Sequence, residues 1–424
     1  MTKEPLKYIF RGDVEAGFFI HALHQGTPDP LVRGCHGNLP PLEGPYICVV
    51  PVKDYWRMIA AMARLHNVRH YANVLEPQIL DDMRARRCVL ILDLSNEGPA
   101  YAAEIFDELF RWIEGNNLPA GQVVWLGQNR NMAARCRDNA GARAELIQFE
   151  YYDFFVKMMA VLFAPGANQQ IVDNNTGSLA DRMFDPGRKD RLLLCLNATP
   201  RIPRVLTVSA LIYHGLLEGS LVSFPGLNYV KDPGSVDDVT AYIDANPSLD
   251  YLRASLVTTL GLSDLRVDEF SEKGNALFAK VDVRPYERTF FSLVTETEFT
   301  DGSVHRITEK IVKPFCLGHP ALIVGNPHSV EFMTELGFLD WGHMIDRTYE
   351  SEPSPAKRFG LLFDEVRRQA YKIRTNPNEW LGLAREIGTA NMRHAAEGKL
   401  LSRYREIYDH PVIERLARMV GHPT

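Results

Sequence analysis

The stretch Arg191–Leu206, RLLLCLNATPRIPRVL, contains the unit from which the fold of this chain can be worked out. Its first six residues are apolar apart from Arg191, which predicts a strand covered on both faces that ends near Asn197. A helix is predicted over Ile202–Leu217, because Pro203 suits a first helical turn and Gly219 follows the end. A buried strand followed directly by a helix is the repeating unit of a parallel α/β sheet.

Similar units lie on both sides of this stretch. Short runs rich in Val, Ile and Leu alternate with helix-like segments, a pattern that predicts largely parallel sheets. The polar, turn-rich segment Asn168–Arg188 interrupts the pattern and is the predicted interdomain linker. The other predicted strands are Tyr46–Val52, Cys88–Leu94, Val123–Gly127, Glu145–Phe149, Phe290–Thr297 and Ala321–Gly325, and Leu221–Phe224 is a further short apolar run. The other predicted helices are Asp54–Leu65, Gln78–Arg87, Tyr101–Gly115, Asp153–Phe163 and Thr308–Leu317, with mostly helical chain from Ala356 onward.

The chain has 424 residues, of which 46% are hydrophobic, enough for two cores. We therefore expect an α/β protein with two Rossmann-like domains that face a cleft. The first domain is expected over 1–170 and the second over 189–352. A helical tail over 353–424 is expected to pack on them. Ligands in such sheets bind at the carboxyl ends of the strands.

Composition limits the partners and the compartment. The formal net charge of −6 argues against binding of duplex nucleic acid through the whole surface. The six cysteines contain no C-x-x-C pair and are predicted to be buried free thiols. With no signal peptide at the start, this predicts a cytoplasmic protein. The longest apolar stretch, Phe154–Pro165, includes Lys157 and is too short for a membrane span.

Two predicted helix starts carry cations that oppose the helix dipole. Arg201 and Arg204 lie at or before the first turn of the helix that follows Asn197. Each such cation costs about 0.3–1 kcal/mol, which a bound phosphate can offset. The alternative is a pair of solvated arginines beside a strand–helix turn.

The second such start is Thr308–Lys310. Thr308 is a plausible N-cap, Glu309 suits the dipole, and Lys310 opposes it. A diphosphate with a ribose attached would explain both residues, because Lys310 would balance the phosphate charge and Glu309 would accept hydrogen bonds from ribose hydroxyls. The alternative is an ordinary capped helix start with a snorkelling lysine.

The segment Val294–Gly325, VTETEFTDGSVHRITEKIVKPFCLGHPALIVG, resembles the donor-binding segment of GT-B glycosyltransferases, especially the α-1,3-fucosyltransferase type. It is also similar to a group of uncharacterised bacterial and phage glycosyltransferase-like proteins. That group carries LNR-x-x-R-x-HR, S-x-VTET, TEK-x-x-KP, LGF and D-x-x-Y. This chain has LNATPRIPR, SLVTET, TEKIVKP, ELGF and DRTY, and it departs at Ala198, where the group often has Arg, and at Pro203, where it often has His.

The resemblance covers about Arg191–Glu350 and implies transfer of a sugar from a nucleotide-diphosphate sugar to an acceptor hydroxyl of unknown identity. It implies that the second domain, 189–352, binds the donor and that the first, 1–170, lies on the acceptor side. It implies that Glu309 contacts the ribose, and that Lys310 and an upstream arginine bind the diphosphate. Glu296, in the VTET strand, is a further candidate. The expected donor-binding residues are Asn197, Arg201, Arg204, Glu296, Thr308, Glu309 and Lys310.

No D-x-D motif occurs in the donor half and no His/Cys cluster has zinc spacing, so we expect neither a metal nor a cofactor beyond the donor. The Arg and Lys side chains would then stabilise the departing diphosphate. An inverting transfer needs a base for the acceptor's proton. Glu97, in DLSNEGPAY, is the first candidate and Asp93, at the end of the same predicted strand, is the second. The alternative for Glu97 is a carboxylate that stabilises the start of a helix.

Two other functions stay open. In the first, the acceptor is a DNA base rather than a glycan or another hydroxyl, and the cluster Arg84, Arg86 and Arg87 contributes to binding it. Salt-dependent DNA binding would identify that function. In the second, the chain binds nucleotide sugars without turnover. Donor binding that is unaffected by Glu97→Gln, without hydrolysis or transfer, would identify that one.

Overall fold

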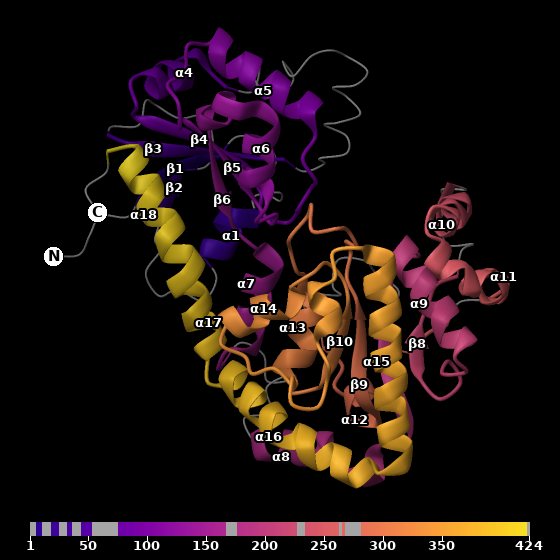
Figure 1. The fold of residues 1–424 in the computed structure, drawn as a ribbon. Helices are drawn as coiled ribbons and strands as arrows, with labels where there is room; N and C mark the ends of the chain where they lie inside the picture. The colour runs from indigo at the N-terminus through magenta and orange to yellow at the C-terminus, as the bar shows by residue number, and fades with distance from the viewer. Residues whose placement is uncertain are drawn as a thin grey trace. The chain divides into compact units, whose positions relative to one another are not determined.

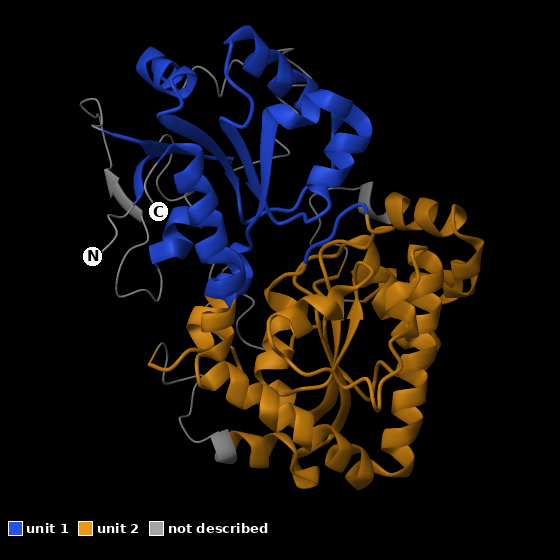
Figure 2. Cartoon of the chain, turned by 60° about the vertical axis from the view of Figure 1, so that its left-hand side comes forward, with its two compact units in different colours: residues 1–157, 303–306, 404–424 blue, residues 158–302, 307–403 orange. Residues whose placement is uncertain are grey.

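A computed structural model of the chain describes residues 6–10, 18–24, 32–35, 44–52, 75–166, 176–226, 234–262, 265–267 and 281–421. The chain divides into two compact units, coloured separately in Figure 2. The first unit comprises Met1–Lys157, Ser303–Arg306 and Tyr404–Thr424, and the second comprises Met158–Gly302 and Ile307–Arg403. Each unit contains one parallel sheet with helices, which confirms the α/β class.

The first sheet has the strand order β2-β1-β3-β4-β5-β6, and every neighbouring pair is parallel. Its central strands are almost entirely apolar and buried, as expected for a sheet with helices on both faces. The bounds are β1 Leu6–Phe10, α1 Phe18–His24, β2 Val32–Cys35, β3 Tyr46–Pro51, α4 Pro77–Arg84, β4 Cys88–Leu94, α5 Ala103–Gly115, β5 Val123–Gly127, α6 Met132–Ala140, β6 Ile147–Tyr151 and α7 Phe154–Phe163.

The second sheet has the order β10-β9-β7-β8, again with parallel pairs. Read from β8, the strands stand in the same order as β2-β1-β3-β4 of the first sheet. From β7 the chain passes to β8 on one side and then to β9 and β10 on the other side, so the strand order reverses between β7 and β9. The bounds are α8 Thr176–Met183, β7 Arg191–Leu196, α9 Ile202–Tyr213, β8 Leu221–Ser223, α10 Gly234–Asp244, α11 Arg253–Leu260, α12 Arg284–Arg288, β9 Thr289–Thr295, α13 Glu309–Cys316, β10 Ala321–Val324 and α14 Ser329–Glu335.

The order of the second sheet determines where two helices begin. Because crossovers between parallel strands are right-handed, α9 and α13 cover opposite faces of the sheet. Both helices start at its carboxyl edge, α9 after β7 and α13 after β9. Their first turns therefore flank the point at which the strand order reverses.

The C-terminal part is helical, as predicted (Figure 1). It contains α15 Pro355–Thr375, α16 Pro377–Ala396, α17 Lys399–Tyr404, a π-helical turn Arg405–Asp409 and α18 His410–Met419. Helix α16 packs against α13 and α8. At the end of α13, Gly318 has a φ of +63°, and a Cβ there would lie 2.3 Å from the Gly388 carbonyl oxygen. Gly318 therefore ends the helix, as predicted, and also permits the close approach of α16.

Several sequence predictions need correction. The second half of the predicted linker Asn168–Arg188 contains α8, because Leu179, Ala180 and Met183 supply one buried side to an otherwise polar segment. Helix α9 ends at Tyr213 rather than Leu217, since Gly215 takes a left-handed φ of +62°. Strand β6 begins two residues later than predicted. Strands β1 and β2 were not predicted, because four or five residues with a Lys or Arg inside give no clear pattern. The predicted helix Asp54–Leu65 lies outside the described residues.

Five cysteines are buried free thiols, as predicted: Cys48, Cys88, Cys136, Cys195 and Cys316. Within the described ranges, no helix combines the length and the apolar character needed to cross a membrane.

Candidate functional site

The carboxyl ends of β7 and β9 meet at the reversal of strand order in the second sheet, where open α/β sheets bind their ligands. The Thr295 hydroxyl at the end of β9 donates to Asn197 Oδ1 at 2.6 Å. The Asn197 backbone N–H donates to the hydroxyl and carbonyl oxygens of Ser223, at the end of β8. Asn197 is 4% exposed, and its hydrogen bonds connect the ends of β7, β8 and β9.

Arg204 lies in the first turn of α9 and is 3% exposed. Its Nη1 donates to the Thr199 carbonyl at 2.9 Å, whereas its buried Nε has no hydrogen-bond partner. Burial lowers the pKa of Arg204 to about 10, with nearby Arg201 acting in the same direction and Glu296 and Glu309 opposing it. The guanidinium is therefore charged at neutral pH, and an N–H group remains available for an acceptor.

Thr308 is the N-cap of α13, as predicted. Its hydroxyl donates to Glu296 Oε2 at 2.6 Å and accepts from the backbone N–H of Lys310 at 3.3 Å. The Thr308 N–H donates to Glu296 Oε1, also at 3.3 Å. Glu296 is 2% exposed, so it acts as an internal acceptor that fixes the start of α13.

Glu309 and Lys310 follow in the first turn and remain partly exposed, with 18% and 26% of their side chains accessible. Lys310 Nζ lies 3.2 Å from Glu309 Oε1 and donates to the Thr308 hydroxyl at 3.1 Å. Burial alone would raise the pKa of the Glu309 carboxyl, but Lys310 and Lys313 outweigh it and the pKa lies below its usual value. Glu309 is thus a charged acceptor at the surface of the site.

The fold brings all seven predicted donor-binding residues to the region around this reversal of strand order, the switch point of the second sheet. Three have their side-chain atoms engaged within the protein, namely Asn197, Glu296 and Thr308. Three offer polar atoms, namely Arg204, Glu309 and Lys310. The seventh, Arg201, is the exposed N-cap of α9 and makes no ion pair within the described part of the chain.

Of the two predicted base candidates in the first unit, Asp93 lies near the end of β4 and Glu97 lies in the loop that follows. Asp93 is 1% exposed, and both its carboxylate oxygens accept backbone N–H groups, from Phe19 and Ser95, each at 3.0 Å. Burial raises the pKa of Asp93. The side chain of Glu97 is 48% exposed, and its Oε2 lies 3.6 Å from Nη1 of the buried Arg306. Glu97 is therefore the better placed of the two to accept a proton from an incoming molecule.

Sequence reasoning missed Arg306 and Gln128. Arg306 is 6% exposed, and its Nη1 donates to Gln128 Oε1 at 3.0 Å. The two residues are 178 positions apart in the chain, so no local pattern links them. Arg306 stands two residues before Thr308, and an arginine so close to a recognised motif was the available signal.

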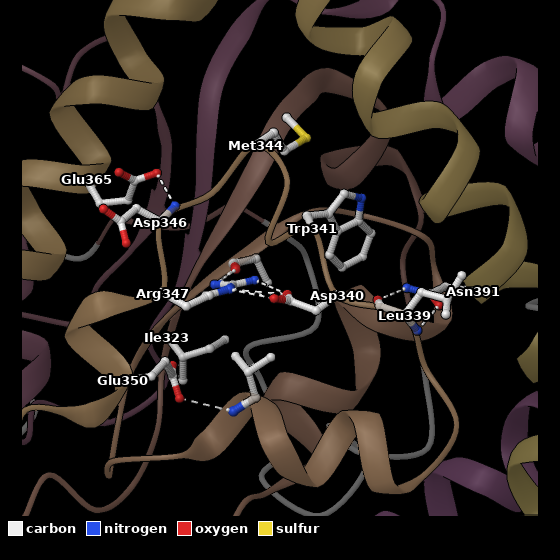
Figure 3. A network of polar contacts seen from close by, with 12 residues as sticks. Ile323, Leu339, Asp340, Trp341, Met344, Asp346, Arg347, Glu350, Glu365 and Asn391 are labelled. Carbon is white, nitrogen blue, oxygen red and sulfur yellow. Dashed lines mark hydrogen bonds and ion pairs between the residues drawn. The ribbon is translucent and has the colours of Figure 1, made fainter.

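The DRTY segment, one of the motifs behind the family resemblance, forms the structural network of Figure 3. Arg347 pairs with Asp340 at 2.5 Å and donates to the Ala321 carbonyl at the start of β10 at 2.9 Å. The Tyr349 hydroxyl accepts from the Ile323 N–H of the same strand. The following Glu350 accepts from the Val330 N–H in α14. These contacts secure β10 and α14.

The basic cluster considered for DNA binding is partly neutralised. Arg84 pairs with Asp81 at 2.6 Å, and Arg87 pairs with Asp82. Arg86, between them, is exposed and has a left-handed φ of 58°. The surface carries less net positive charge than the sequence alone indicates.

Among the described residues, no group of three or more His, Cys, Asp or Glu side chains is arranged to hold a metal ion. No protein-family model and no curated protein matches the chain. Among solved structures, the N-terminal domain of Candida albicans trehalose-6-phosphate phosphatase is similar over 95% of this chain and 100% of that chain, with 7% sequence identity and a TM-score of 0.36. A TM-score this low supports no argument about function.

Proposed function

We propose that the chain is a GT-B glycosyltransferase that moves a sugar from a nucleoside-diphosphate sugar to an acceptor hydroxyl. The observation that carries this proposal is Arg204, a buried guanidinium with an unpartnered Nε at the switch point of the second sheet. Burying a cation with an unpartnered N–H is unfavourable unless an anionic group accepts a hydrogen bond from that N–H and balances the charge. A phosphate at the first turns of α9 and α13 is such a group.

The other residues take roles that fit their surroundings. Lys310, partly exposed in the first turn of α13, is the second cation for the diphosphate, and the exposed Arg201 is the third. Glu309 accepts hydrogen bonds from the ribose hydroxyls. Asn197, Glu296 and Thr308 hold the strand ends and the helix start in place. Two of the three cations are at least partly accessible, which allows them to contact the ligand directly.

In the proposed reaction, the acceptor oxygen forms a bond to the anomeric carbon while the bond from that carbon to the diphosphate oxygen breaks. The electron pair of the broken bond leaves on the diphosphate. Arg204 and Lys310 stabilise this charge, a task that other glycosyltransferases give to a metal ion, so the proposed transfer is metal-independent. Glu97 takes the proton of the acceptor hydroxyl.

Thermal shift with nucleoside diphosphates tests the donor site. UDP, GDP, dTDP and CDP are compared on wild type, Lys310→Ala and the control Lys357→Ala. The control removes an exposed lysine from the first turn of a different helix, α15. A nucleotide at about 100 times its dissociation constant stabilises the fold by about 2.7 kcal/mol. We expect one nucleotide to raise the melting temperature of wild type and Lys357→Ala but not of Lys310→Ala.

If no nucleotide shifts wild type at millimolar concentration, the proposal is wrong. If a nucleotide binds, the variant Glu97→Gln separates an enzyme from a nucleotide-sugar-binding protein. In an enzyme, Glu97→Gln keeps the nucleotide shift and loses release of nucleoside diphosphate from the sugar nucleotide. In a binding protein, there is no release to lose and the shift is unchanged.

A further inference from the structure

The tetrapeptide Ser303–Arg306 lies between β9 and α13 in the chain but belongs to the first unit. It is held by the loop that follows β5. The Arg130 N–H donates to the His305 carbonyl and the His305 N–H donates to Asn129 Oδ1, both at 3.0 Å. Asn129 Nδ2 donates to the Ser303 carbonyl at 3.4 Å. The backbone that immediately precedes Arg306 is thereby anchored to the loop at the carboxyl edge of the first sheet.

Arg306 links the loops that follow β4 and β5. Its Nη1 donates to Gln128 Oε1 at 3.0 Å and lies 3.6 Å from Glu97 Oε2. Gln128 is itself fixed, because its backbone N–H donates to the Glu97 carbonyl and its Nε2 donates to Asp153 Oδ1, both at 3.0 Å. A guanidinium that is 6% exposed thus holds a carboxylate that is 48% exposed.

Gly98 makes this placement of Arg306 possible. A Cβ on Gly98 would lie 2.3 Å from Arg306 Cδ, 3.1 Å from its Nε and 3.2 Å from its Nη1. Gly98 does not have a left-handed φ, so alanine at this position meets a steric obstacle rather than backbone strain. The glycine beside Glu97 therefore leaves room for the arginine side chain to lie across the loop.

We infer that Arg306 is a positioning residue that orients the Glu97 carboxylate for proton transfer, and that Gly98 provides the space for it. This inference rests on the proposed function, in which Glu97 is the base. The exposed carboxylate would otherwise sample many rotamers, and the ion pair to a buried, anchored guanidinium restricts it. Because general bases act only within hydrogen-bond distance of the proton they take, a misplaced carboxylate loses rate rather than substrate affinity.

The test is release of nucleoside diphosphate from UDP-glucose, UDP-N-acetylglucosamine, GDP-mannose or GDP-fucose, with water as the acceptor. The water oxygen forms a bond to the anomeric carbon, the diphosphate leaves with its electron pair, and Glu97 takes the water proton. The variant Gly98→Ala retains every charged group and displaces Arg306. We expect kcat to fall about 10- to 100-fold with KM nearly unchanged. The control Gly115→Ala, at the end of α5, places its Cβ where no atom lies within 4 Å and stays near wild type.

A double-mutant cycle distinguishes positioning from general damage. In the Glu97→Gln background, Gly98→Ala should cause no further loss, because there is no longer a carboxylate to orient. Arg306→Lys should retain more kcat than Arg306→Gln, since the charge survives. The inference is overturned, with the proposed function intact, if Gly98→Ala matches wild type or slows Glu97→Gln by the same factor as wild type. If wild type releases no diphosphate from any of the four sugar nucleotides, the proposed function fails and this inference fails with it.

Discussion

Arg204 and Arg358 are both buried in the second unit, at 3% and 2% exposure, yet their surroundings differ. Arg358, on α15, donates to four backbone carbonyls, those of Gly325, Thr300, Glu352 and Pro353, at 2.5 to 3.2 Å. Arg204 donates to one carbonyl and keeps an unpartnered Nε. Burial lowers the pKa of each to about 10.

The difference separates a cation that builds the fold from one that is available to a ligand. The carbonyls around Arg358 belong to the loops after β9 and β10 and to the segment just before α15, so its guanidinium joins three segments. The groups around Arg204 include the carboxylates of Glu296 and Glu309 and the guanidinium of Arg201. Equal burial therefore does not distinguish a structural arginine from a ligand-binding one. The number of N–H donors that remain without a partner does.

The largest expected effect is on stability, from Arg358→Met. This change leaves four carbonyls without their donor, and we expect the free energy of unfolding to fall by about 3–5 kcal/mol in urea titrations. The matched control is Arg367→Met on the same helix, where the side chain is 57% exposed and pairs with Asp364. That change should alter stability by less than about 1 kcal/mol. A loss for Arg358→Met no larger than the control would break the comparison.

The next effect is on binding, from Arg204→Met. Removal of a charge-assisted contact to phosphate costs about 1.5–3 kcal/mol, so the affinity for the nucleoside diphosphate should fall about 10- to 150-fold by calorimetry. The unfolding free energy without nucleotide should stay within about 1 kcal/mol of wild type or rise, because an incompletely satisfied buried charge is removed. If Arg204→Met instead destabilises the fold as much as Arg358→Met with unchanged affinity, Arg204 is a structural cation.

The smallest effect, about 1.4 kcal/mol for each pH unit, concerns His319, another buried basic group of the second unit. Its Nδ1 lies 2.9 Å from the Ser292 hydroxyl and its Nε2 lies 2.9 Å from the Thr289 carbonyl oxygen, so the neutral ring has both nitrogens engaged. Burial, together with the charge of Lys189, lowers the pKa of His319 to about 3.

The unfolded chain has an ordinary histidine, which takes up a proton as the pH falls below about 6.5, whereas the folded chain does not. His319 therefore costs no stability above that pH. Below it, stability should fall by about 1.4 kcal/mol per pH unit until the pH nears the folded pKa. Urea titrations between pH 6 and pH 4 should show a shallower slope for His319→Gln, with nucleotide affinity at neutral pH unchanged. Equal slopes would show that His319 is not the group that titrates.

The strand and helix pattern of the second unit was predictable because it is local. The run before Asn197 and the Thr308 cap were both identified from neighbouring residues, and the structure confirms them. Helix α8 was missed because its buried face is short and depends on α16 for its cover. The sequence identified the predicted donor-binding residues. It could not show which of them bond within the protein and which remain available to a ligand, because that depends on distant partners such as Thr295, which donates to Asn197.

The sequence by itself determined which residues could carry charge chemistry and which segments would form strands and helices, because cations at helix starts and apolar runs are properties of neighbouring residues. Tertiary structure alone decided that Glu296 accepts hydrogen bonds from Thr308, that Arg204 is buried with an unpartnered N–H, and that Arg306 lies beside Glu97. Burial and hydrogen-bond satisfaction depend on groups that are far apart in the chain and meet only when the sheets have formed. For that reason, the available cation at the switch point could be suspected from the sequence but recognised only in the fold.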